Sequence, residues 1–141
     1  MPTRGRSWAV DTSVAVAALD AAHAAHADCR SVVQARRPSL AGHAAFETYS
    51  VLTRLPGQLA LDGPTAAGLL AQVFPMIVAL DAADAPSLLA RFGSIGIVGG
   101  AVYDGLVGEA ARAHGCVLLT RDLRARRTYD LLGAEYELIG V

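Results

Sequence analysis

Short apolar runs alternate along this chain with longer segments in which apolar residues recur every three or four positions. The runs favour buried β-strands, and the longer segments favour amphipathic helices. The predicted strands cover residues 8–10, 39–41, 76–80, 116–120 and 136–139. The predicted helices begin at a Thr12 or Ser13 cap, cover residues 24–37, 43–55, 65–74, 86–92 and 101–114, and end with a segment that follows Asp122 and runs to Leu132. The glycine-rich residues 93–100 predict a flexible connection.

The order of these elements predicts the fold. Strands that alternate with helices form a parallel sheet with helices on both faces, so we expect an α/β protein. A chain of 141 residues suits a single domain, and we assign residues 1–141 to it. Ligands of such sheets bind in the crevice outside the carboxyl ends of the strands. We therefore expect the functional site at that edge.

Composition and charge narrow the class of protein. With 53% hydrophobic and 18% charged residues, the chain is globular rather than disordered, and its net charge of −1 gives no global positive field. Asp11 interrupts the basic segment 1–6 before a signal peptide can form, and the apolar stretch 66–80 is too short and too broken for a membrane span. We expect a cytoplasmic protein in which Cys29 and Cys116 are buried, reduced thiols.

Four of the thirteen acidic residues stand out from the rest. We interpret nine as solvent-facing, in turns or on exposed helical faces: Asp20, Asp28, Asp62, Asp81, Asp84, Glu109, Asp130, Glu135 and Glu137. Asp11 and Asp122 instead follow apolar strands, while Glu47 and Asp104 lie in the first turns of helices. Each alone is explained equally well as a helix cap or as a favourable charge near a helix N-terminus. Their joint appearance at one predicted edge indicates a site.

Such a cluster of carboxylates calls for a cation. Like charges in a crevice of low dielectric raise carboxyl pKa values unless a metal balances them. Mg²⁺ and Mn²⁺ take oxygen ligands, and Mg²⁺ commonly binds through a few carboxylates together with waters and substrate phosphates. A metal held in this way supports attack of water on a phosphodiester.

The four acids lie in segments that together resemble a known family. The segments are VDTS at 10–13, FE at 46–47 leading to VLTRLP at 51–56, GGAVYD at 99–104 and LTRD at 119–122. In this order and spacing they resemble the PIN-domain toxins of VapBC toxin–antitoxin systems, over nearly the whole chain. The resemblance implies a three-layer α/β/α fold with a central parallel sheet, RNA cleavage with Mg²⁺ or Mn²⁺, a homodimer, and inhibition by a cognate VapB antitoxin.

The same resemblance assigns roles to individual residues. The family's catalytic quartet falls on Asp11, Glu47, Asp104 and Asp122, of which Asp11, Asp104 and Asp122 are expected to hold the metal. Its supporting hydroxyl groups, which orient a carboxylate or a metal-bound water, fall on Thr12, Ser13 and Thr120. An acidic pocket of this kind also accepts a guanidinium group, so a basic tail of the antitoxin could compete with the metal.

Arginine supplies all twelve basic residues, and a group of four lies beside Asp122: Arg121, Arg124, Arg126 and Arg127. Arginine binds phosphate bidentately, so we expect these four to contact the RNA backbone, although a solvated helix face would look the same. Tyr129 either stacks on a base or packs in the core. His23 and His26 suit a helix start better than a zinc site, and we interpret His43 and His114 as structural.

Two other classes of protein place an aspartate at the end of the first strand. Phospho-accepting signalling domains and phosphatases of the haloacid-dehalogenase type both use a lysine near the phosphoryl group, and this chain has no lysine. The dehalogenases also need a second aspartate where this chain has Ser13. A catalytically silent PIN fold that binds RNA or protein stays open as the alternative. Loss of a quartet acid would favour it, and all four are present.

Overall fold

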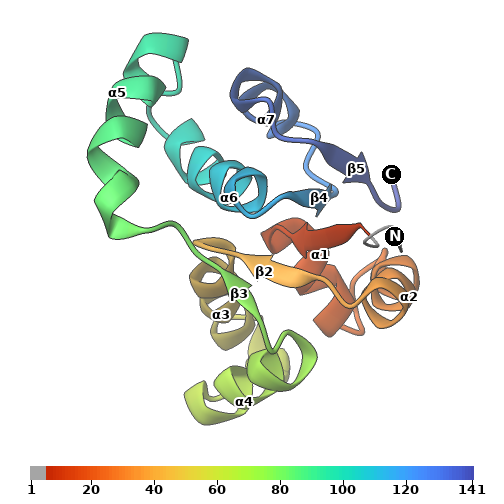
Figure 1. Cartoon of the computed structure of the whole chain (residues 1–141). Coiled ribbons are helices and arrows are strands. Elements are labelled where there is room, and N and C mark those ends of the chain that lie inside the picture. Colours follow the sequence, from red (N-terminus) through yellow and green to blue (C-terminus); the bar gives the residue numbers. More distant parts are fainter. Residues whose placement is uncertain (1–5) are drawn as a thin grey trace.

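The computed structural model describes residues 6–141, and a parallel sheet forms its centre (Figure 1). The strands are β1 (Ser7–Val10), β2 (Ser39–Ala41), β3 (Ile77–Val78), β4 (Cys116–Thr120) and β5 (Tyr136–Leu138). Their order in the sheet is β3-β2-β1-β4-β5, and every neighbouring pair is parallel. All five carboxyl ends therefore face the same edge.

Helices cover both faces of the sheet. They are α1 (Thr12–Leu19), α2 (His26–Arg36), α3 (Ala44–Thr53), α4 (Gly63–Val73), α5 (Ala85–Ile95), α6 (Ala101–Ala113) and α7 (Arg126–Leu132), with 3-10 turns at Gly57–Leu59 and Ala82–Asp84. Figure 1 shows α1 to α4 on one side of the sheet and α5 to α7 on the other. This arrangement confirms the predicted α/β/α sandwich.

Each face of the sheet has its own core, because successive strand residues point to opposite faces. Val10, Leu40 and Leu119 belong to a cluster packed against α1 to α4. Ala9 and Leu118, one residue earlier on their strands, belong to the cluster packed against α5, α6 and α7. The alternation fixes the register, since a shift of one residue would exchange the two cores.

Several predicted boundaries differ from the structure. The predicted strand 76–80 is reduced to Ile77–Val78, because β3 is the edge strand and pairs with β2 alone. The predicted flexible connection 93–100 is also too long. Helix α5 continues to Ile95 and ends at Gly96, whose φ of 82° lies in the left-handed region that glycine adopts without strain.

Other predictions from composition can be compared with the described residues. Cys29 and Cys116 are free and buried, as expected. Within residues 6–141, no helix combines the length and the apolar character that a membrane crossing requires. The basic segment before Arg6 lies outside the described residues, so its interpretation stays a prediction.

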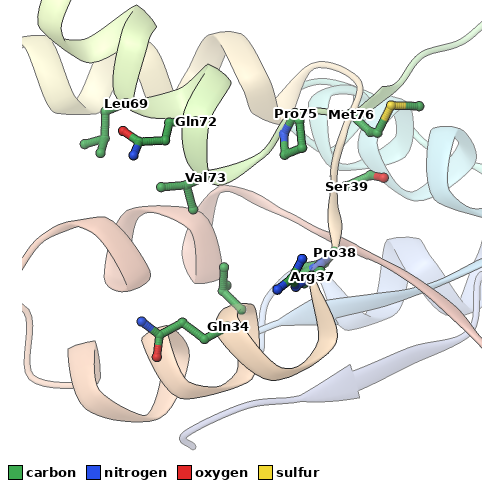
Figure 2. Close-up of a pocket in the computed structure, with 10 residues that line it drawn as sticks. Gln34, Arg37, Pro38, Ser39, Leu69, Gln72, Val73, Pro75 and Met76 are labelled. Carbon is green, nitrogen blue, oxygen red and sulfur yellow. The ribbon is translucent and has the colours of Figure 1, made fainter.

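A cavity of about 550 Å³ opens at the amino ends of β2 and β3, away from the four acids (Figure 2). Ser39 and Met76 line it where these strands begin, while Gln34 comes from α2 and Gln72 from α4. Its lining contains neither aspartate nor glutamate. The cavity therefore lies at the edge opposite to the one where ligands of a parallel sheet bind.

Candidate active site

Asp11 lies directly after β1 and forms the N-terminal cap of α1. Its backbone is extended, and its Oδ1 accepts hydrogen bonds from the backbone N–H groups of Ser13 at 3.0 Å and Val14 at 3.3 Å. The Ser13 hydroxyl donates to the same oxygen at 2.5 Å. The predicted cap at Thr12 or Ser13 is thus replaced by Asp11 itself. Only 5% of Asp11 is exposed.

The second oxygen of Asp11 is held from the other side of the sheet. Thr120, the last residue of β4, donates its hydroxyl to Oδ2, and the Tyr129 hydroxyl of α7 donates to Oδ2 at 2.9 Å. Burial raises the pKa of Asp11, and hydrogen bonds from these hydroxyls and from Ser13 oppose that shift. Hydrogen bonds from both faces therefore fix the carboxylate in one orientation.

Tyr129 is a contact that sequence reasoning missed. The residue is only 1% exposed, so it cannot stack on an RNA base, and core packing was the correct alternative. A buried tyrosine hydroxyl needs a polar partner, which was the available signal. The partner could not be named, because Asp11 and Tyr129 are 118 residues apart in the sequence.

Asp122 is tied to Asp11 through the same hydroxyl groups. The backbone N–H of Arg121 donates to Ser13 Oγ at 2.8 Å, and the backbone N–H of Asp122 donates to Thr120 Oγ1 at 3.0 Å. Asp122 Oδ1 accepts a hydrogen bond from the backbone N–H of Arg124 at 2.9 Å. Ser13 and Thr120 therefore support both the first acid and the loop that carries the last one.

Glu47 lies in the first turn of α3, as predicted, and contacts two side chains. The Thr12 hydroxyl donates to its Oε2 at 3.0 Å, and His43 Nε2 lies 3.3 Å from its Oε1. His43 also stacks on Tyr103, with 5.3 Å between ring centroids and an interplanar angle of 24°. His43 thus contacts the candidate site. Its i,i+4 spacing from Glu47 was the sequence signal for this contact.

Asp104 lies in the first turn of α6 and is half-buried. Its pKa is raised to about 6, first by burial and then by the negative charges of Asp122, Asp11 and Glu47. The four predicted acids therefore form one electrostatic cluster at the carboxyl edge, although they come from four separate segments.

The donor set of this cluster fits a hard divalent cation. Within residues 6–141, no three Asp, Glu, His or Cys side chains converge closely enough to enclose an ion by themselves. Mg²⁺ does not require this, because it keeps several waters and binds through one or two carboxylates. The crowding that raises the pKa of Asp104 is the charge that such an ion would neutralise.

The four predicted RNA-binding arginines differ in their surroundings. Arg121 Nη2 donates to the carbonyl of Gly140 at 3.0 Å, and its Nε is buried, so this side chain turns toward the C-terminal segment. Arg124, Arg126 and Arg127 are exposed. Only these three present guanidinium groups that a phosphate could reach.

Glu109 corrects one prediction. It is only 5% exposed rather than solvent-facing, because α5 supplies Arg91, whose Nη1 lies 2.9 Å from Glu109, and α6 supplies Arg112. Arg91 also donates to the Leu132 carbonyl at 2.8 Å, which ties α5 to α7. The two histidines near α2 have structural contacts: His23 Nδ1 accepts from the Ala25 N–H, and His26 Nδ1 lies 2.9 Å from the Ala17 carbonyl.

Comparison with known proteins identifies the family to which this arrangement belongs. The sequence profile of the PIN domain matches residues 9–131, a segment that contains all four acids. The chain belongs to the PIN-domain family.

Similarity to curated proteins extends over almost the whole chain. "Ribonuclease VapC27" of Mycobacterium tuberculosis strain ATCC 25618 / H37Rv is 47% identical over 128 residues, which are 89% of this chain and 91% of that protein. "Ribonuclease VapC40" of strain CDC 1551 / Oshkosh is 43% identical over 134 residues, which are 93% of this chain and 98% of that protein. The resemblance to VapC proteins of the PIN-domain family is thereby confirmed.

Proposed function

We propose that this PIN-domain protein is a metal-dependent endoribonuclease and the toxin of a VapBC pair. The observation that carries the proposal is the cluster of Asp11, Glu47, Asp104 and Asp122 at one edge of the sheet, in which the other three charges raise the pKa of Asp104. The names of the VapC relatives support RNA as the substrate.

Asp11, Asp104 and Asp122 would hold Mg²⁺, for which Mn²⁺ would substitute. When bound, the ion supplies charge neutralisation at the phosphodiester and lowers the pKa of a water molecule. The residues of the chain position these groups: Ser13 and Thr120 orient Asp11, and Thr12 orients Glu47. Glu47 completes the catalytic quartet, with one oxygen held by Thr12 and the other facing His43.

The same proposal includes partners. A cognate VapB-type antitoxin would inhibit the enzyme, with a basic side chain competing for the carboxylates that bind metal. Arg124, Arg126 and Arg127 would contact the RNA backbone from the exposed surface beside Asp122, while the contacts of Arg121 make its predicted part in RNA binding secondary. We further propose a homodimer that acts in the cytoplasm, with residues 1–141 as one domain.

Chelation tests this function directly. The purified protein is incubated with single-stranded RNA in Mg²⁺, in Mn²⁺, and in Mg²⁺ with excess EDTA. We expect cleavage with either metal and its loss in EDTA, with recovery when Mg²⁺ is restored. Cleavage that continues undiminished in EDTA would exclude the metal mechanism. RNA binding without cleavage under every condition would instead identify the silent PIN-fold module.

A further inference from the structure

A second recognition element lies next to the acidic cluster. A cavity of about 390 Å³ opens between α3 and α6, and its walls include His43, Glu47, Arg54, Tyr103 and Asp104. Because Glu47 and Asp104 belong to the acidic cluster, a chain whose phosphate is bound there can continue into this cavity. The cavity is therefore positioned to receive a nucleotide adjacent to the cleaved bond.

The aromatic wall of the cavity is fixed in orientation. Glu47 holds the His43 imidazole through Nε2, and the imidazole stacks on the Tyr103 ring at 5.3 Å. Tyr103 nevertheless remains 55% exposed. An aromatic ring that is held in place yet open to solvent offers a stacking surface whose ordering cost is already met before the ligand arrives.

A cation lies at the far end of the same cavity. Arg54 is the C-terminal cap of α3, whereas Glu47 lies in the first turn, so their Cα atoms are roughly 10 Å apart along the helix. Arg54 is exposed and faces the cavity rather than the acidic cluster. The cavity thus runs from carboxylates, past aromatic rings, to a guanidinium group.

We propose that the His43–Tyr103 pair is a stacking surface for a nucleobase of the RNA chain, and that Arg54 binds a phosphate of the same strand. This inference rests on the proposed function. Single-stranded RNA is recognised by bases stacked on aromatic side chains and by arginine contacts to the backbone. Stacking tolerates any base, so the subsite favours an unpaired nucleotide without selecting a sequence.

The test measures binding rather than cleavage, so it is independent of catalysis. All variants are made in the Asp11→Asn background, and binding to fluorescent single-stranded oligouridylate is followed by anisotropy in Mg²⁺. We expect Tyr103→Ala to raise Kd about ten-fold, and Tyr103→Phe to stay near the parent protein because it keeps the ring. Leu89→Ala, which removes an equally exposed apolar side chain on α5, should leave Kd unchanged.

An abasic oligonucleotide with the same backbone separates stacking from charge. The parent protein should bind it about ten-fold more weakly than oligouridylate, and Tyr103→Ala should bind both RNAs alike. Arg54→Gln should weaken binding of both RNAs equally. The proposal is overturned if Tyr103→Ala binds oligouridylate as tightly as the parent does, or if the parent does not distinguish the two RNAs. Failure of the proposed function would appear separately, as absence of cleavage by the unmodified protein.

Discussion

The two halves of the acidic edge are built differently. Asp11 is buried, and both of its oxygens accept hydrogen bonds from Ser13, Thr120 and Tyr129; we call this the closed half. Glu47 and Asp104 are only half-buried beside an open cavity, and we call them the open half. The closed half fixes one ligand before any metal arrives, whereas the open half leaves room for water and substrate. Substitutions in the two halves should therefore have different consequences.

The largest effect is expected from Asp11→Asn in the closed half. Cleavage should fall by a factor of about 1000 or more, since the substitution removes a proposed metal ligand that no neighbour can replace. The fold should persist, because asparagine still accepts the bonds from Ser13 and Val14 and its amide can donate to the Thr120 hydroxyl oxygen. Initial rates of RNA cleavage and far-UV circular dichroism measure both outcomes.

Asp62→Asn is the matched control, because Asp62 caps α4 at a fully exposed position away from the cluster. It should leave the cleavage rate unchanged and lower the melting temperature by at most a few degrees, roughly the effect of a weakened cap. Wild-type turnover by Asp11→Asn would remove Asp11 from the catalytic quartet.

An intermediate effect is expected from Tyr129→Phe, which also acts on the closed half. The substitution leaves one oxygen of Asp11 held by Thr120 alone, so the carboxylate gains freedom to rotate. We expect kcat to fall about ten-fold and the Mg²⁺ concentration for half-maximal cleavage to rise, as occurs when a group that orients a metal ligand is lost. A purely structural role would lower the melting temperature without changing the Mg²⁺ dependence.

Tyr136→Phe provides the control for this variant. Its ring lies 5.8 Å from that of Tyr129, but its side chain does not reach Asp11. Loss of its hydroxyl should leave the Mg²⁺ dependence unchanged. Equal responses of the two variants would indicate that aromatic packing, rather than the hydrogen bond to Asp11, is the important contribution of Tyr129.

The difference between the halves also explains what the sequence could predict. Asp11 and Asp122 were predicted because each follows an apolar strand, and the carboxyl ends of parallel strands share an edge. Glu47 and Asp104 were predicted from their places in first helical turns. These signals are local, and the parallel sheet then brings the four segments together.

Contacts that depend on packing between distant segments were not predictable in the same way. The buried state of Glu109 depends on Arg91 of α5, and the orientation of Asp11 depends on Tyr129 of α7. The stack of His43 on Tyr103 likewise joins α3 to α6. No spacing along the chain reports such contacts, because they arise only when helices from different parts of the sequence pack on the sheet.

The smallest effect concerns stability and belongs to the open half. The pKa of Asp104 is raised to about 6, so the folded state binds a proton more tightly than the unfolded state does. In EDTA, the wild-type protein should therefore gain stability from this group as the pH falls through 6 toward about 4, and lose it as the pH rises. Asp104→Asn removes this penalty and should raise the melting temperature by about 3 °C at pH near 7.5, with no difference near pH 4. Saturating Mg²⁺ should reverse the order, because only the wild-type protein would gain the full stabilisation by the ion. Thermal denaturation at both pH values, with and without Mg²⁺, measures the four cases. A variant that is less stable than wild type in EDTA near pH 7.5 would show that the charges of the open half are not in conflict.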